Sequence, residues 1–196
     1  TQVFRNNQVN SWIQEMRQRN VPCSDKISLS ITLSNPVVVR QWLIEGLPTD
    51  SFSIDNAISI FNSRRWPLMI DPQGQANKWI RATERKRNMD ITRMTNPNLL
   101  RSLENCIRTG TPLMLEDMTE HFEPAIEPIL QKSIFKQGGR LIIRLGDSDV
   151  DYDPAFKFYM TTKMPNPHYL PEVCIKVTVI NFTVTFDGLQ DQLLGD

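Results

Sequence analysis

Short apolar runs alternate along the chain with segments in which apolar residues recur every three to four positions. The apolar runs lie at residues 65–70, 91–94, 113–115, 158–161 and 177–182. Segments with helical spacing lie between them, at residues 75–87, 99–110, 123–132 and 166–173. The runs have the length and composition of buried strands, and the spaced segments predict helices that each bury one face.

Strands that alternate with helices at these intervals predict a parallel sheet, because parallel strands need crossover connections. Helices then cover both faces of the sheet, and the fold class that we expect is α/β. Residues 140–153 have a different pattern, in which two alternating strands flank a turn at residues 146–149. This pattern predicts a β-hairpin, which we expect to be an insertion into the α/β unit.

The first 55 residues do not follow this alternation. Residues 9–19 have helical spacing, and the basic residues near the end of that segment suit the helix dipole. Residues 20–55 contain several prolines, and their apolar pieces are too short for helices. Because aromatic and aliphatic side chains are frequent there, we expect an ordered, extended lead-in at residues 1–55 that packs on the α/β domain at residues 56–186.

Composition narrows the class of protein. The 196 residues carry 22 Lys and Arg against 22 Asp and Glu, and this zero net charge argues against a general nucleic-acid binder. The 3 cysteines lie far apart, with neither zinc spacing nor a disulfide framework, so a reducing compartment fits best. No run reaches the roughly 18 apolar residues of a membrane span, and we expect a soluble protein with no membrane partner.

A strand that leads through a tight turn into a helix is the setting of a phosphate-binding loop. In such a loop the backbone N–H groups and the helix dipole hold the anion. The turn between the strand at 65–70 and the helix at 75–87 occupies this setting. Its residues are Asp71, Pro72, Gln73, Gly74, Gln75, Ala76, Asn77 and Lys78.

This loop lacks the residues that a working phosphate-binding loop needs. Aligned on Pro72, the pattern places Asp71 at the first glycine and Asn77 at the lysine. Aligned on Lys78, it places Asn77 at a glycine and Trp79 at the hydroxyl residue that would contact magnesium. A carboxylate at position 71 would also repel phosphate. We interpret the loop as vestigial and kept for its shape, with weak nucleotide binding as the alternative.

Polar residues at the ends of two other strands complete the candidate site. Glu116 and Asp117 follow the apolar run at 113–115, where an acidic pair would hold magnesium and activate water in an ATPase. The other interpretation is a pair of structural contacts. Thr161 and Thr162 end the next strand, where they could contact a γ-phosphate or serve as ordinary strand-end hydroxyls.

Other chemical patterns are weaker. Asp147, Asp149, Asp151 and Asp153 are spaced like calcium ligands, but the Gly and Glu that a calcium loop requires are absent. We interpret these four residues as the solvent face of the hairpin.

The histidines and cysteines carry no catalytic motif. His121 and His168 belong to no zinc-hydrolase motif, and Cys106 lies on an apolar helix face as a core residue. We therefore expect neither a catalytic residue nor a metal site. A basic cluster at the end of the helix at 75–87 is interpreted as a solvated helix terminus, with a docking patch as the alternative. Its members are Arg81, Arg85, Lys86 and Arg87.

The run from Asn62 to Ile80, which contains the degenerate loop, closely resembles the fifth AAA+ module of dynein heavy chains. The same resemblance extends over residues 46–54, 144–147, 166–173 and 188–194. It thus covers nearly the whole chain. Trp66 and the run at 75–79 are similar to axonemal rather than cytoplasmic heavy chains.

The resemblance implies an AAA+, P-loop NTPase-like large subdomain, one of six modules in a ring that moves toward microtubule minus ends. In that family the fifth module has lost its Walker A motif and does not hydrolyse ATP. We therefore expect a non-catalytic structural module that relays conformational change around the ring. The alternative is a regulatory module that binds nucleotide with weak or no hydrolysis. Residues 187–196 resemble the start of the connection to a buttress and a small subdomain.

The resemblance also implies partners and a location. We expect contacts with neighbouring AAA+ modules of the same chain, microtubule binding through the stalk of the parent, and association with dynein light and intermediate chains. The expected location is the cytoplasm and cytoskeleton, in the axoneme of a cilium or flagellum. No cofactor is expected in this module, because ATP and magnesium belong to other modules of the parent.

Overall fold

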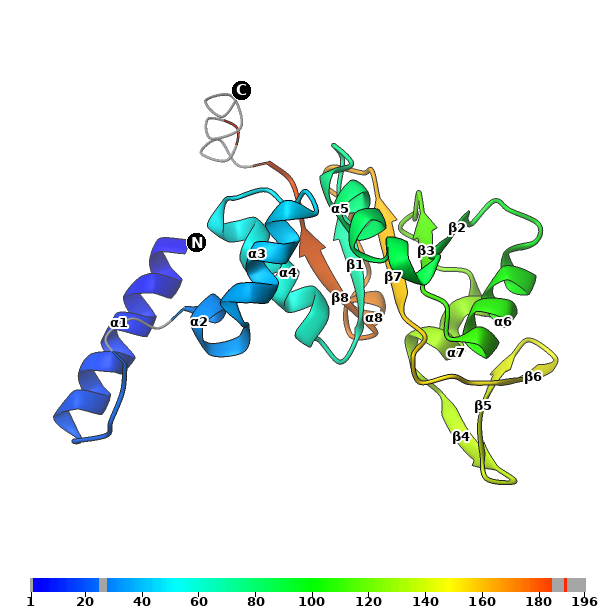
Figure 1. The fold of residues 1–196 in the computed structure, drawn as a ribbon, viewed down its shortest axis with the longest axis horizontal. Coiled ribbons are helices and arrows are strands. Elements are labelled where there is room, and N and C mark those ends of the chain that lie inside the picture. Colours follow the sequence, from blue (N-terminus) through cyan, green and yellow to red (C-terminus); the bar gives the residue numbers. More distant parts are fainter. Residues whose placement is uncertain (1, 25–27, 185–188, 190–196) are drawn as a thin grey trace.

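The computed structural model describes residues 2–24, 28–184 and 189, and it has an α/β architecture (Figure 1). Within these residues, five parallel strands form the main sheet in the order β2-β3-β7-β1-β8. Their bounds are Trp66–Ile70 for β1, Asp90–Arg93 for β2, Leu113–Glu116 for β3, Phe158–Thr162 for β7 and Val177–Asn181 for β8. The predicted α/β class and parallel sheet are confirmed.

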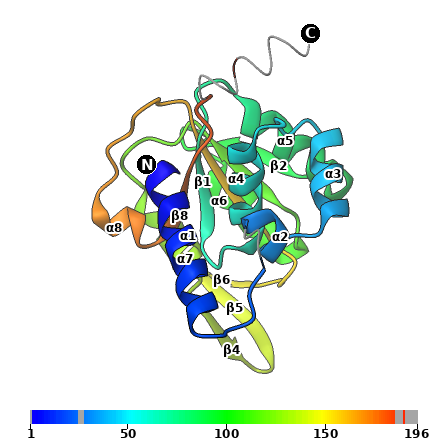
Figure 2. The same cartoon turned by 90° about the vertical axis from the view of Figure 1, so that its left-hand side faces the viewer.

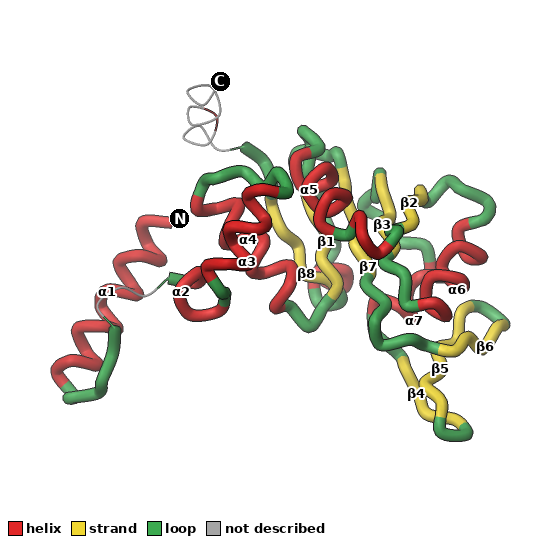
Figure 3. The backbone as a smooth tube through the Cα atoms, in the orientation of Figure 1, coloured by secondary structure: helices red, strands yellow, loops and turns green. Residues whose placement is uncertain are grey.

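Helices connect the strands in the predicted alternation (Figure 3). They are α5 (Gln75–Thr83), the 3₁₀ turn η1 (Arg85–Arg87), α6 (Leu99–Thr109), the 3₁₀ turn η2 (Pro124–Ile126), α7 (Glu127–Leu130) and α8 (Pro171–Cys174). The helix α6 ends at Gly110, whose φ of 69° is left-handed and suits glycine. Among the described residues, no helix is both long and apolar enough to span a membrane.

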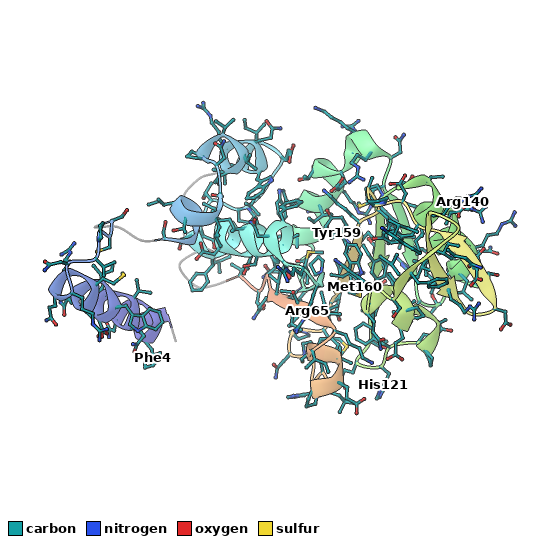
Figure 4. All side chains as sticks on the ribbon, turned by 90° about the horizontal axis from the view of Figure 1, so that it is seen from below. Phe4, Arg65, His121, Arg140, Tyr159 and Met160 are labelled. Atoms are coloured by element: carbon teal, nitrogen blue, oxygen red, sulfur yellow. The ribbon has the colours of Figure 1, made fainter. Side chains whose placement is uncertain are left out.

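Side chains of the sheet alternate between two cores, one on each face. On β1, Leu68 belongs to the first core and Met69 to the second. On β7, Met160 belongs to the first core and Tyr159 to the second. Figure 4 shows both residues in the middle of the molecule. Because both faces are covered, the inner strands β1, β3 and β7 are buried along almost their whole length, which explains why short apolar runs located them. The edge strands β2 and β8 are partly exposed and carry polar residues.

Helices from different parts of the chain cover these two faces. The first core includes residues of α6 and α7, and the second includes residues of α4 (Ser51–Asn62) and α5. Figure 2 shows α4 and α5 on one side of the β1–β8 pair and α8 on the other. In the second core the fully buried ring of Trp79 lies 6.0 Å from Trp42 and 5.9 Å from Phe61, centroid to centroid. Aromatic packing thus attaches the N-terminal helices to α5.

The prediction that residues 20–55 contain no helix is wrong. This stretch forms α2 (Leu29–Leu33), α3 (Pro36–Ile44) and the start of α4. Asn35 caps α3 by accepting the N–H of Val37 at 2.9 Å, and Asp50 caps α4 by accepting the N–H of Ser53 at 2.9 Å. Such short helices are stabilised by packing and caps, which periodicity alone does not reveal. The division at residue 55 stays a prediction, and residues 187–196 lie outside the described residues except for Leu189.

The helix α1 (Gln2–Gln18) begins earlier than predicted and stands apart from the two cores. Figures 1 and 4 both show it separated from the sheet, with Phe4 near one of its ends. Phe4 is 66% exposed and Trp12 is 55% exposed. This helix therefore adds nothing to the packing that positions the site.

The predicted hairpin is part of a larger insertion between β3 and β7. It comprises β4 (Ile134–Gln137), β5 (Arg140–Leu145) and β6 (Ser148–Asp151), which form an antiparallel sheet in the order β4-β5-β6. The extra strand β4 escaped prediction because most of it is exposed and carries no alternation. Figure 1 shows the insertion below the main sheet, whereas the main strands end at the top, so it leaves their carboxyl ends open.

A buried carboxylate ties α5 to β7 near the amino end of the sheet. Glu84 is 2% exposed and accepts hydrogen bonds from Lys157 Nζ at 2.8 Å and Tyr159 Oη at 2.6 Å. Arg87 pairs with its second oxygen at 3.2 Å. Burial alone would raise the pKa of Glu84, but the hydrogen bonds from Lys157 and Tyr159 and the nearby cations lower it. The group is therefore ionised and fully partnered.

We expect Glu84→Ala to lower the free energy of unfolding by about 2 kcal/mol, because the buried hydroxyl of Tyr159 loses its acceptor and the partly exposed Lys157 and Arg87 lose their counter-charge. Urea denaturation at neutral pH measures this loss. Glu15→Ala, which breaks an exposed pair with Arg19, is the control and should change stability by less than about 1 kcal/mol. Equal stability of the two variants would contradict the role given to Glu84.

Candidate functional site

The carboxyl ends of β1, β3 and β7 meet the amino end of α5 at the upper edge of the sheet in Figure 1. A cavity of about 350 Å³ opens there. Its lining consists of Asp71, Gly74, Asn77, Lys78, Arg81, Arg93, Glu116, Asp117, Thr161 and Lys163. Most of these are residues that the sequence singled out, because strand-end residues of a parallel sheet converge at one edge.

The turn between β1 and α5 is built around the carboxylate of Asp71. Gly74 forms the bend before the helix, with a left-handed φ of 75°. Asp71 is 2% exposed, and its N–H donates to the carbonyl oxygen of Thr162 at 2.8 Å. Its Oδ1 accepts the N–H of Gln75 at 2.9 Å, and its Oδ2 accepts the N–H of Asn77 at 2.8 Å. The carboxylate thus occupies the first amides of α5, where a loop of this kind holds phosphate.

This placement sharpens the expectation drawn from the sequence. There Asp71 was expected to repel phosphate from beside the loop, whereas the structure places it on the amides themselves. Burial raises the pKa of Asp71 above the usual aspartate value, and the backbone N–H groups of residues 74–77 oppose that rise. The site therefore combines a poorly solvated carboxyl group with donors that favour its ionised form.

The other residues of the loop divide between solvent and core. Pro72 is half-buried and Gln73 is exposed, and neither lines the cavity. Ala76 is fully buried in the second core. Lys78 is exposed and lines the cavity. The loop therefore directs Lys78 and Asn77 toward the cavity from one turn of α5.

The acidic pair at the end of β3 is neutralised by basic residues. Glu116 is 8% exposed, accepts a hydrogen bond from Asn77 Nδ2 at 2.7 Å and pairs with Arg81. Asp117, in a left-handed conformation with φ of 55°, pairs with Arg93 Nε at 3.1 Å and Lys163 Nζ at 3.0 Å. Arg81 lies on α5, Arg93 on β2 and Lys163 just after β7. The ion pairs of Glu116 and Asp117 therefore link the end of β3 to these three elements.

The pKa of Glu116 reflects these contacts. Burial would raise it, but the hydrogen bonds from Asn77 and Arg81 and the charge of Arg81 lower it below the usual glutamate value. An ionised carboxylate already bonded to an amide and a guanidinium is a weak candidate for activating water. The geometry favours structural contacts over a magnesium site at this pair.

Thr161 and Thr162 at the end of β7 differ in whether they line the cavity. Thr161 lines the cavity, and its carbonyl oxygen accepts the N–H of Met118 at 2.9 Å. Thr162 is 1% exposed, and its hydroxyl accepts the N–H of Met164 at 3.2 Å. Of this pair, only Thr161 lies among the residues that line the cavity.

Sequence reasoning missed Arg93 and Lys163 and did not identify the partner of Arg81. Arg81 was grouped with a solvated helix terminus, yet it pairs with Glu116, and Arg87 of the same group pairs with Glu84. Arg93 ends β2 and Lys163 follows β7 directly. Arg93 and Lys163 could have been identified from their position at the ends of strands, which is the criterion that selected Glu116 and Asp117.

The remaining candidates lie outside this cavity. On the inserted sheet, Arg144 Nε donates to Asp149 at 2.8 Å, and Arg140 pairs with Asp151 at 3.8 Å. Within the described part of the chain, no group of three or more His, Cys, Asp or Glu is arranged to hold a metal ion. Cys106 is buried on α6, where burial and the neighbouring Asp90 raise the pKa of its thiol to about 12.

We expect Glu116→Gln to lower the free energy of unfolding by about 1–2 kcal/mol at neutral pH, because Arg81 loses its counter-charge. The pKa of Glu116 is lowered in the folded state, so this difference is full above the usual glutamate pKa and disappears as the pH falls through the folded value. Urea denaturation at pH 7 and pH 3 measures both effects. Glu123→Gln, on an exposed carboxylate, is the control, and equal stability of the two variants at pH 7 would contradict the structural role of Glu116.

Comparison with known proteins places this arrangement in a family. A family model described as the ATP-binding dynein motor region matches residues 40–196. Human dynein axonemal heavy chain 6 is 57% identical over 100% of the chain, and mouse dynein axonemal heavy chain 3 is 50% identical over 95% of it. Mouse dynein axonemal heavy chain 1 is 45% identical over 100%. The chain spans 5% of the length of each of these relatives.

The five-stranded parallel sheet with its cavity beyond β1, β3 and β7 is consistent with an AAA+ fold, and the family match covers the whole of this sheet. The similarity to axonemal heavy chains extends further, over the N-terminal helices as well. On these grounds the chain belongs to the family of ATP-binding dynein motor regions.

Proposed function

We propose that this chain is the fifth AAA+ module of an axonemal dynein heavy chain, and that it acts as a non-catalytic structural unit. Its assignment as the fifth module rests on the resemblance of residues 62–80, and its lack of catalysis rests on Asp71. The observation that carries the proposal is the pair of hydrogen bonds from the amides of Gln75 and Asn77 to the Asp71 carboxylate.

Nucleotide binding at this loop would require a phosphate to displace that carboxylate. The amides of Gln75 and Asn77 lie at 2.9 and 2.8 Å from the Asp71 oxygens, so they are not available to a second anion. If both anions remained about 4 Å apart, their repulsion would be about 4 kcal/mol at an effective dielectric constant of about 20. Asp71 therefore disfavours phosphate by competition and by charge.

Hydrolysis lacks its other components as well. No hydroxyl residue follows Lys78, since the next residue is Trp79, whose side chain is fully buried. Glu116 and Asp117 are paired with Arg81, Arg93 and Lys163. A magnesium ion would have to displace these cations before it could bind the acidic pair.

In this proposal the module relays movement between its neighbours as a rigid block. The contacts of Asp71 and Glu116 join α5 to β7 and β3, and those of Glu84 join it to β7 at the other end. A unit held in this way transmits force without a nucleotide cycle of its own. The parent would be an ATP-driven, minus-end-directed motor of the cilium or flagellum axoneme. Its partners would be adjacent AAA+ modules, the microtubule through a stalk, and light and intermediate chains.

A regulatory nucleotide-binding module is the second candidate function. It is favoured by the cavity of about 350 Å³ and by the exposed Lys78 on its lining. Under this alternative, phosphate would contact Lys78 while Asp71 moves off the amides of α5.

Isothermal titration calorimetry of the 196-residue chain with ATP and magnesium separates the two functions. We expect no binding in the micromolar range, because the amides of α5 already hold Asp71. Lys78→Ala is the matched variant and should behave as the wild type does. Micromolar binding that Lys78→Ala abolishes would overturn the structural function and support the regulatory one.

A further inference from the structure

The amides that Asp71 occupies keep the geometry of an anion site. Gly74 makes the left-handed bend before the first turn of α5. The N–H groups of Gln75 and Asn77 in that turn both donate to the same carboxylate. Lys78 and Arg81 line the cavity just beyond it. The loop has therefore lost the sequence of a phosphate-binding loop while its donors remain in place.

The group at this point is an anion supplied by the chain itself. Asp71 is 2% exposed, and each of its carboxylate oxygens accepts one of the two amide hydrogens. A carboxylate, like a phosphate, presents oxygens that can each accept a hydrogen bond from a backbone amide. The backbone of Asp71 is anchored as well, because its N–H donates to the carbonyl oxygen of Thr162 on β7 at 2.8 Å.

We propose that Asp71 is a tethered ligand: its carboxylate permanently fills an intact oxyanion site at the start of α5, and removing it exposes that site to inorganic phosphate. The inference deepens the proposed non-catalytic function and rests on it, because the tether can stay in place only if no nucleotide displaces it. It adds that the backbone donors of the loop are occupied and not lost, whereas the missing glycine and hydroxyl residues are a separate defect of the loop.

The charges around the cavity agree with this assignment. Its lining contains the carboxylates of Asp71, Glu116 and Asp117 together with the cations of four residues. These four cations are Lys78, Arg81, Arg93 and Lys163. Removal of the Asp71 charge leaves an excess of two positive charges, which favours uptake of a small anion.

The test is thermal unfolding of Asp71→Ala with and without inorganic phosphate, at constant ionic strength. Without phosphate the variant should melt lower than the wild type, because two amides of α5 lose their acceptor. Phosphate should raise the Tm of the variant by about 3 °C or more and leave the wild type unchanged. In the double variant Asp71→Ala/Lys78→Ala, phosphate should raise the Tm by less, since Lys78 lines the exposed site.

Asp50→Ala is a matched control for the loss of a helix cap. Asp50 caps α4 through the N–H of Ser53 at 2.9 Å, and it does not line the cavity. Its removal should also lower the Tm, but phosphate should not restore it. If phosphate raised the Tm of Asp50→Ala as much as that of Asp71→Ala, the proposal would be overturned, because the stabilisation would then be a general effect of the salt.

Other results would also overturn the tethered ligand. It is overturned if Asp71→Ala keeps the Tm of the wild type, or if phosphate raises the Tm of the wild type as much as that of the variant, because Asp71 would then not occupy the amides. If Asp71→Ala does not fold, hydrogen exchange of the wild type decides: protection of the Gln75 and Asn77 amides without added anion supports the proposal, and protection only with phosphate overturns it. Failure here with no ATP binding in calorimetry would leave the non-catalytic function standing.

Discussion

One buried carboxylate organises the junction on which the site depends. Asp71 leaves β1 with its N–H bonded to β7, and its two oxygens hold the first turn of α5. The central strands and the helix that follows β1 are therefore joined at a single residue. Unlike a nucleotide, this anion is covalently part of the chain and cannot dissociate from it. The proposed non-catalytic function rests on this junction.

The charges of the cavity follow from that constraint. Where a nucleotide-binding site would balance acidic side chains with a metal ion, this cavity balances Glu116 and Asp117 with Arg81, Arg93 and Lys163. Asn77 joins the two halves, since its N–H donates to Asp71 and its side chain donates to Glu116. The β1–α5 turn and the acidic pair at the end of β3 are thus connected through one residue of α5.

Much of the fold could be predicted, and the errors have physical causes. Strands such as β1 and β7 are buried on both faces, so their composition revealed them. The helices at residues 29–44 were missed because they are short and are stabilised by caps at Ser28 and Asn35 and by burial of Trp42. The strand β4 was missed because its exposed residues show no alternation and its pairing with β5 sets its conformation.

The sequence by itself determined the alternation of the main-sheet strands with helices, the degenerate residues of the β1–α5 turn and the resemblance to dynein heavy chains. These are local properties, readable from periodicity and from neighbouring residues. Only the tertiary structure decided that Asp71 lies on the amides of α5 and that Arg93 and Lys163 meet at Asp117. The contacts of Asp117 depend on the strand order β2-β3-β7, which brings distant residues to one edge. The contacts of Asp71 are local along the chain, but they depend on a side-chain direction that the sequence pattern does not specify.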